Sequence, residues 1–138
     1  MITGAHFLLY SSDPEADRGF FRDVLDFQSV DAGDGWLIFA LPPSELGIHP
    51  SEGEAGQRHA GHQMAPTVFY LMCKDLRSYI KSLQARPVTC SDVQEAGWGL
   101  ATTIRLPSGA EIGLYEPRHP TAFEPKSKGE ATRGKGRG

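Results

Sequence analysis

One short pattern occurs twice in this chain. Residues 45–50 read ELGIHP and residues 111–117 read EIGLYEP, so Glu, an aliphatic residue, Gly, a second aliphatic residue, a ring-bearing residue and then Pro recur in nearly the same order. Repetition on this scale indicates a fold built from two copies of one unit, because a single small unit cannot cover its own apolar face.

The repeat also extends toward the N-terminus of each copy. HFLLYSSDPEADRGFF begins at His6 and VFYLMCKDLRSYIKSL begins at Val68. In both stretches an apolar run of strand type leads to an aspartate, Asp13 or Asp75, whose carboxylate can accept backbone N–H bonds of a first helical turn. Pro14 follows at a position where its missing N–H costs nothing. Apolar residues then recur at helical spacing, which predicts an amphipathic helix in each copy.

Short strands are expected after each helix. We assign them to residues 27–32, 35–41 and 45–49 in the first copy, and 87–92, 99–106 and 110–116 in the second. Gly and Asp in DAGDGW, and the PSG triplet before the last strand, supply turns. Each copy is therefore β-α-β-β-β, and the predicted fold class is α+β, with two βαβββ modules forming curled mixed sheets around a cleft.

This arrangement divides the chain into four segments. We predict a first module at residues 1–50, an inter-module linker at 51–66, a second module at 67–118 and a basic tail at 119–138. The linker is polar and rich in glycine, which is typical of a connection rather than a packed element. The tail lacks apolar periodicity, so we expect it to be solvated.

Composition and charge exclude several classes of protein. The net charge of −3 argues against a nucleic-acid-binding body, so nucleic acid is not an expected partner. No apolar run approaches the roughly 18 residues of a membrane span, and the N-terminal stretch has no basic region of a signal peptide. The two cysteines, Cys73 and Cys90, form no CxxC motif. A reducing cytoplasm is therefore the predicted location.

The repeated residues resemble a known superfamily. The pattern H-x-x-L-Y-x-x-D-P-x-A-x-x-F-F-x-D-V-L at residues 6–25, together with LPSGAEIGLYEP at 106–117, is similar to the vicinal oxygen chelate superfamily. That superfamily includes glyoxalase I, extradiol dioxygenases, fosfomycin-resistance enzymes and bleomycin-resistance proteins. The resemblance covers about residues 1–118 and implies a glyoxalase-like fold whose curled sheets hold a ligand or a metal. It also implies pairing as a homodimer.

The resemblance further implies where metal ligands would lie. They belong on the first and last strands of each module, which here correspond to His6 and Gly47 in the first module and to Val68 and Gly113 in the second. Only His6 can bind a metal. The two glycines would instead leave space, bounded by His6, Tyr70 and Tyr115, for an apolar or aromatic part of a ligand.

The predicted function is therefore a small-molecule-binding protein, similar to the bleomycin-resistance branch, that works without a standard metal site or other cofactor. An apolar and aromatic cavity suits a flat organic ligand. Its expected lining residues are His6, Leu8, Tyr10, His49, Val68, Tyr70, Met72 and Tyr115. Trp36 and Trp98 are expected to cover a sheet edge or line the mouth of the cleft, with stacking on a ligand as the alternative.

An enzyme of the same superfamily is the alternative function. Strand alternation places His49 on the same face as Gly47, so a displaced metal site formed by His6 and His49 is conceivable. Glu111 or a linker histidine, His59 or His62, would complete it. Imidazole and carboxylate ligands suit zinc, nickel or iron, and the protein would then be a metal-dependent lyase or dioxygenase.

Overall fold

The chain forms two compact units with interleaved sequence. The computed structural model describes residues 5–122, so the predicted basic tail lies outside the described residues beyond residue 122. The first unit contains the described part of Met1–Leu41 together with Arg105–Glu111. The second contains Pro42–Ile104 and the described residues from Ile112 onward. Both units combine helix and strand, which confirms the α+β class.

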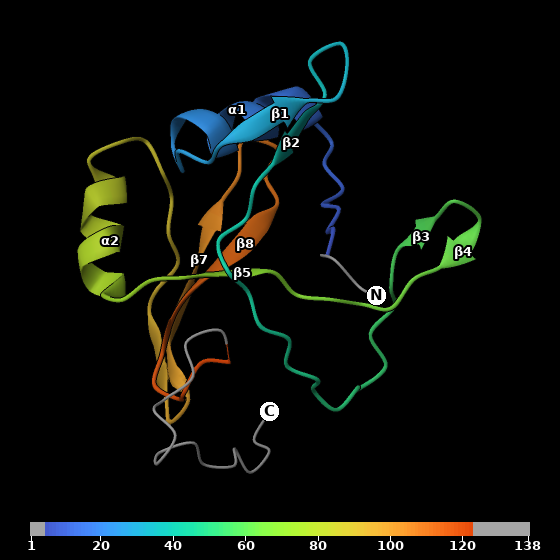
Figure 1. Ribbon diagram of the computed structural model, residues 1–138. Coiled ribbons are helices and arrows are strands. Elements are labelled where there is room, and N and C mark those ends of the chain that lie inside the picture. Colours follow the sequence, from blue (N-terminus) through green and yellow to red (C-terminus); the bar gives the residue numbers. More distant parts are fainter. Residues whose placement is uncertain (1–4, 123–138) are drawn as a thin grey trace. The chain divides into compact units, whose positions relative to one another are not determined.

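The first unit is built around helix α1, Pro14–Asp23. As predicted, Asp13 caps the helix, since its carboxylate accepts a hydrogen bond from the backbone N–H of Ala16 at 3.2 Å. Strands β1, Ser29–Asp31, and β2, Leu37–Phe39, pair as an antiparallel hairpin (Figure 1). The ring of Phe21 lies 5.7 Å from the ring of Phe27 and 5.7 Å from that of Phe39. These aromatic contacts form the small core between α1 and the hairpin.

A buried carboxylate joins α1 to the turn at residues 106–110. Asp17 is buried on the helix, and its carboxylate accepts hydrogen bonds from both the backbone N–H of Ser108, at 3.0 Å, and the Ser108 hydroxyl, at 2.8 Å. The turn itself is closed by a bond from the Leu106 N–H to the Ala110 carbonyl at 2.7 Å. The two hydrogen bonds compensate for much of the free-energy cost of removing the carboxylate from water, which explains why a charged group is tolerated there.

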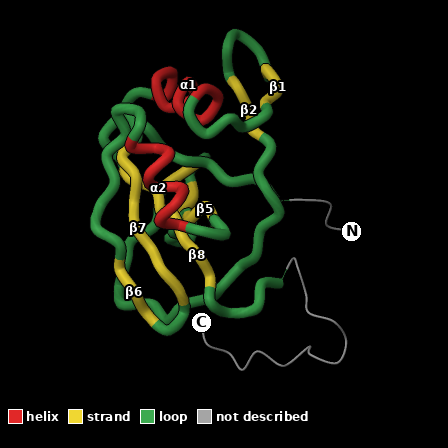
Figure 2. The backbone as a smooth tube through the Cα atoms, turned by 90° about the vertical axis from the view of Figure 1, so that its left-hand side faces the viewer, coloured by secondary structure: helices red, strands yellow, loops and turns green. Residues whose placement is uncertain are grey.

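The second unit holds a four-stranded sheet. Its strands are β5 (Tyr70–Met72), β6 (Gln94–Ala96), β7 (Gly99–Arg105) and β8 (Glu111–Pro117), in the spatial order β5-β8-β7-β6. Figure 2 shows these strands side by side. β5 runs parallel to β8, and β6 runs antiparallel to β7. Leu114 in the middle of β8 is fully buried.

Helix α2, Leu76–Gln84, covers one face of this sheet (Figures 1 and 2). Asp75 caps it as predicted, accepting a bond from the Ser78 N–H at 3.1 Å. The Glu116 carboxylate on β8 accepts a second bond, from the Leu76 N–H, at 2.9 Å. The apolar stripe of the helix is buried, so the unit has a core of its own.

The predicted linker is not structureless throughout. Strands β3, Arg58–His59, and β4, His62–Gln63, form a two-residue hairpin within it. Ala60 and Gly61 at the turn have φ values of 51° and 83°. Positive φ at both turn residues gives the turn type whose twist matches a hairpin. The sequence showed no Asn-Gly or Asp-Gly pair there, so this hairpin was not predicted.

Three expected strands are absent from the described residues. The apolar run that begins at His6 and residues 45–49 both lack strand structure, and residues 87–92 keep only a single bridge between Cys90 and Ile104. An alternating apolar pattern favours an extended backbone, but a strand also needs a neighbour whose backbone groups pair with it. The first of these segments and residues 45–49 join no sheet, and their large apolar side chains are exposed.

Within residues 5–122, neither helix is long and apolar enough to cross a membrane.

Candidate functional site

The face of the second unit's sheet opposite to its buried β8 side chains collects aromatic residues. β5 and β8 pair in a register that sets Tyr70 beside Gly113 and Met72 beside Tyr115. Paired residues of neighbouring strands point to the same face, and alternate residues of one strand share that face. The structure therefore brings together Tyr70, Met72 and Tyr115, three of the residues predicted to line a ligand site.

Trp98 extends this group into a continuous set of rings. The ring centroid of Tyr115 lies 5.6 Å from that of Tyr70 and 5.6 Å from that of Trp98, with tilted planes. The Tyr115 hydroxyl donates a hydrogen bond to the Trp98 carbonyl at 3.2 Å, which holds the two residues together. We call Tyr70, Trp98 and Tyr115 the aromatic cluster. Tyr70 is 44% exposed and Trp98 50% exposed, so the cluster presents ring surface to solvent.

Two glycines make the close packing of the cluster possible. A Cβ at Gly113 would overlap the Tyr70 ring, and a Cβ at Gly99 would overlap the Glu116 carbonyl and crowd the Tyr115 ring. The Tyr70 ring thus lies directly on the backbone of β8. An aromatic side chain that covers a glycine on the neighbouring strand is a recognised way of completing a sheet.

This observation corrects the expected role of Gly113. We expected both repeat glycines to leave open space for a ligand, but at Gly113 that space holds the Tyr70 ring. At Gly47, by contrast, nothing lies within 4 Å of the position that a Cβ would take. The two glycines of the repeat therefore differ in their surroundings although their sequence contexts match.

A carboxylate and an imidazole border the aromatic cluster. The His119 ring lies 5.7 Å from the Tyr115 ring, and its Nε2 lies 3.8 Å from Oε2 of Glu45. The other oxygen of Glu45 accepts a bond from the Ala122 N–H at 2.8 Å. Only 18% of the Glu45 side chain is exposed. Burial raises the pKa of the Tyr115 hydroxyl, and the nearby charges of Glu45 and Tyr70 raise that pKa further.

The remaining predicted site residues are exposed. His6, Leu8 and Tyr10 belong to an extended segment of the first unit. Val68 precedes β5 in the second unit. The His49 ring, also in the second unit, donates through Nδ1 to the Pro50 carbonyl at 2.9 Å.

The described residues contain no group of three His, Cys, Asp or Glu side chains placed to hold a metal ion. Glu111, the third member of the conceivable displaced site, is paired with Arg105 at 3.5 Å. A ligating side chain at position 113 would also have to displace the Tyr70 ring. The residues present therefore do not fit the standard metal site, whereas the displaced site remains a hypothesis.

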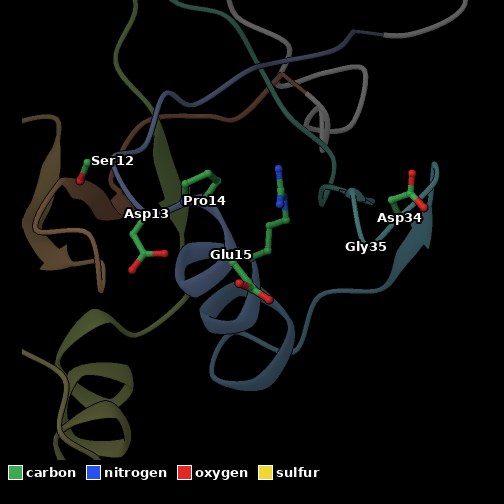
Figure 3. Close-up of a pocket in the computed structure, with 7 residues that line it drawn as sticks. Ser12, Asp13, Pro14, Glu15, Asp34 and Gly35 are labelled. Carbon is green, nitrogen blue, oxygen red and sulfur yellow. The ribbon is translucent and has the colours of Figure 1, made fainter.

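An open cleft of about 470 Å³ lies in the first unit at the start of α1. Figure 3 shows Asp13 and Glu15 at the helix and Asp34 on the β1–β2 loop. Its main charged groups already have local partners: Asp13 caps the helix, and the Arg18 guanidinium lies 4.6 Å above the ring of Trp36. The Trp36 ring thus has Arg18 as a local partner.

Sequence reasoning did not select Glu45 or His119. Glu45 is the first residue of the first repeated pattern, and strand alternation places it on the same face as Gly47 and His49. This alternation was the signal that could have identified Glu45 as a site residue. The composition of residues 119–138 placed His119 in the basic tail, so its position two residues after the end of β8 was not considered. Trp98 was recognised as a residue of the second copy, with ligand stacking only as the alternative role.

Comparison with solved structures identifies the fold. The chain is similar to TnmS3, an antibiotic binding protein from Streptomyces sp. CB03234, with a TM-score of 0.58 and 21% identity over 85% of this chain and 98% of TnmS3. It is also similar to a lactoylglutathione lyase from Agrobacterium tumefaciens, with a TM-score of 0.56 and 16% identity over 83% of this chain and 92% of the lyase. The chain has a glyoxalase-like fold.

The glyoxalase-like fold confirms the fold class that the repeat predicted. Sequence identities of 16% and 21% show similarity of fold only. The two similar proteins are also named for different activities, one for binding an antibiotic and one as a lyase. No family model matches the sequence, and no curated protein matches it significantly. Function therefore has to be argued from the residues of this chain.

Proposed function

We propose that this protein binds a small, flat organic molecule, as a glyoxalase/bleomycin-resistance-like binding protein. The observation that carries the proposal is the aromatic cluster, in which the ring centroid of Tyr115 lies 5.6 Å from that of Tyr70 and 5.6 Å from that of Trp98. Tyr70 and Trp98 keep about half of their surface exposed. Rigid aromatic side chains of this kind give a large contact area at low conformational cost.

The rings are held in place by the chain rather than by chance contact. Tyr70 rests on the backbone at Gly113, and Tyr115 is tied to the Trp98 carbonyl. The backbone N–H of Arg118 donates to that same carbonyl at 2.9 Å. A surface that is ordered before binding loses less entropy when a ligand stacks on it, which favours affinity.

The tryptophan fluorescence of the protein provides a direct test. The chain has two tryptophans, so Trp36→Phe leaves Trp98 as the sole reporter. We expect a panel of flat aromatic compounds to contain ligands that change Trp98 emission saturably. Removing a ring with Tyr70→Ala should weaken such a ligand about 2- to 10-fold, as expected for loss of one aromatic contact of about 0.5–1.5 kcal/mol. Met64→Ala, an exposed apolar residue of the second unit outside the aromatic cluster, is the control and should leave affinity unchanged.

A saturable ligand whose affinity is unchanged by Tyr70→Ala would contradict the proposed site. The variants are informative only if they fold, so each is first compared with the unaltered chain by circular dichroism. Tyr70→Leu is a milder second variant, since it keeps an apolar side chain over Gly113 while removing the aromatic ring.

The proposed binding activity does not use the superfamily's standard metal site. Its support is the side-chain chemistry: glycine at position 47, and at position 113 a glycine covered by the Tyr70 ring. We expect protein purified without chelators or a metal-affinity tag to contain well under one zinc, nickel or iron ion per chain. One ion per chain, lost on His6→Ala, would instead favour the alternative of a metal-dependent lyase or dioxygenase.

We also propose that the protein is a cytoplasmic homodimer. Support for the dimer comes from residues 46 and 48, since Leu46 and Ile48 are 81% and 82% exposed and a second copy would cover apolar surface of this kind. Support for the compartment comes from Cys73 and Cys90, which are both free thiols. Sedimentation at micromolar concentration should give twice the 15.0 kDa chain mass. A single species at the chain mass would refute the dimer.

A further inference from the structure

We infer that the aromatic cluster selects cationic aromatic ligands over neutral or anionic ones of the same shape. This inference rests on the proposed binding function and names the class of ligand. Its basis is that an electron-rich surface of three rings lies beside the carboxylate of Glu45, whose side chain is only 18% exposed.

The rings supply the first part of the preference. The faces of tyrosine and tryptophan carry a partial negative charge and attract a cation that lies within about 6 Å of the ring centroid. Tyr115 stands between the other two rings, at 5.6 Å from each. A flat ligand that stacks on one exposed ring of the cluster therefore has a second ring close enough to act on its charge.

Glu45 supplies the second part. Its Oε2 lies 3.8 Å from Nε2 of His119, whose ring lies 5.7 Å from the Tyr115 ring. In keeping with this placement, the charge of Glu45 helps to raise the pKa of the Tyr115 hydroxyl. Its carboxylate is held by the Ala122 N–H and is largely shielded from water, and a shielded charge acts more strongly on its neighbours than an exposed one. A negative charge close to the rings adds to their attraction for a cation and repels an anion.

The other charged groups near the cluster do not cancel this carboxylate. Arg118 follows β8, but its guanidinium is paired with Glu95 at 3.1 Å. The His119 Nε2 lies 3.8 Å from Glu45, which is longer than a hydrogen bond. Glu116 adds a further negative charge, although its carboxylate serves the start of α2. The two carboxylates, Glu45 and Glu116, therefore make the surroundings of the cluster negative.

Three probes that share the quinoline ring system test the inference: N-methylquinolinium, quinoline and quinoline-4-carboxylate, which are cationic, neutral and anionic at pH 8. Their affinities are measured on the full chain from the shift of the Trp98 indole N–H in nuclear magnetic resonance titrations. We expect N-methylquinolinium to bind about 3- to 10-fold more tightly than quinoline, and the carboxylate to bind more weakly than both.

Glu45→Gln isolates the contribution of the charge. Glutamine keeps an oxygen that can accept the Ala122 N–H, so the local structure is preserved while the charge is removed. The variant should lower the ratio of N-methylquinolinium affinity to quinoline affinity to the value that the rings alone provide. The affinity for quinoline itself should not change. Glu52→Gln, an exposed carboxylate elsewhere in the second unit, is the matched control and should keep the full preference.

The possible failures are distinguishable. If all three probes shift the Trp98 indole with equal affinity, the preference for cations is wrong while the proposed binding function stands. If none of them shifts it, and no other flat compound does, the binding function itself is wrong. If Glu45→Gln fails to fold, the ratio of the cation to quinoline affinity in the unaltered chain decides alone, and a ratio near one overturns the inference.

Discussion

The two copies of the repeat have nearly the same sequence but different environments. In the second copy, Ile112 and Leu114 of EIGLYEP are buried in a paired strand. In the first, the matching Leu46 and Ile48 of ELGIHP are exposed and form no strand. The same local pattern thus gives a core strand only where a neighbour pairs with it, which shows that strand formation is decided by tertiary partners.

The comparison of the two glycines leads to the same conclusion. Gly113 is covered by an aromatic ring from the neighbouring strand, whereas Gly47 has open space beside it. In the second copy the glycine therefore has a packing role, and the residues around it form the candidate site. The first copy contributes exposed apolar residues instead, which form part of the surface proposed above for contact with a second copy.

Truncating matched core positions should show the largest difference between the copies. Leu114→Ala removes a fully buried side chain and should lower the free energy of unfolding by about 2–5 kcal/mol. Ile48→Ala should change it by less than about 0.5 kcal/mol at concentrations where the chain is monomeric. Urea denaturation monitored by circular dichroism measures both. Equal losses would mean that residues 45–50 are packed within the single chain.

Adding a methyl group to each repeat glycine gives the next largest difference. Gly113→Ala forces the Tyr70 ring to move and should destabilise the protein by about 1–3 kcal/mol. The added methyl group of Gly47→Ala has no atom within 4 Å. This substitution should be neutral, or should stabilise the protein by about 0.4–1 kcal/mol because alanine lowers the conformational entropy of the unfolded chain. Combining Gly113→Ala with Tyr70→Leu should recover part of the loss. An unchanged melting temperature for Gly113→Ala would show that the ring does not rest on the strand.

The buried carboxylate of α1 tests what stabilises the first unit. Asp17→Asn keeps one oxygen that can accept from Ser108, but it turns an amide N–H₂ group toward the second Ser108 donor. The substitution should therefore lower the free energy of unfolding by about 1–3 kcal/mol. Asp23→Asn is the matched control, because that carboxylate pairs with Arg22 on the surface and should contribute little. Chemical denaturation of both variants checks the prediction, and equal effects would contradict the role given to Asp17.

The alkaline limb of the stability curve should report on the aromatic cluster and show the smallest effect. The pKa of Tyr115 is raised in the folded protein, chiefly by burial, so the unfolded chain loses this proton first as the pH rises. Stability should therefore be complete below the ordinary tyrosine pKa of about 10 and should fall above it. Tyr115→Phe should reduce that fall, whereas Tyr10→Phe, an exposed tyrosine, should not. Identical alkaline curves for the two variants would contradict this environment for Tyr115.

Sequence reasoning predicted the parts of the fold that depend on local chemistry. Both helices begin where Asp13 and Asp75 indicated, because an N-cap is decided within four residues. The last two strands of the second copy also lie close to their predicted positions. In the first copy, the strands expected at residues 27–32 and 35–41 form the β1–β2 hairpin. The strand expected at residues 45–49 is absent, because its pattern specifies alternation and does not specify a partner.

The candidate site was predictable only in part, for a related reason. Tyr70, Met72 and Tyr115 were selected because alternation placed them on one face of two strands. The register between β5 and β8 was not available from sequence, so the coverage of Gly113 by Tyr70 was missed. Glu45 and Tyr115 are far apart along the chain, and only the fold places the charge of Glu45 close enough to raise the pKa of the Tyr115 hydroxyl.

The most direct test of the account is to map binding on both units in one experiment. A ¹⁵N-labelled chain is titrated with the flat ligand that binds best, and the backbone and indole N–H signals are followed. The account predicts saturable shifts at the Trp98 indole and the Gly113 amide, with the Trp36 indole and the Gly35 amide unchanged. Shifts confined to Trp36 and Gly35, at the cleft beside α1, would contradict it and would place the ligand site in the first unit.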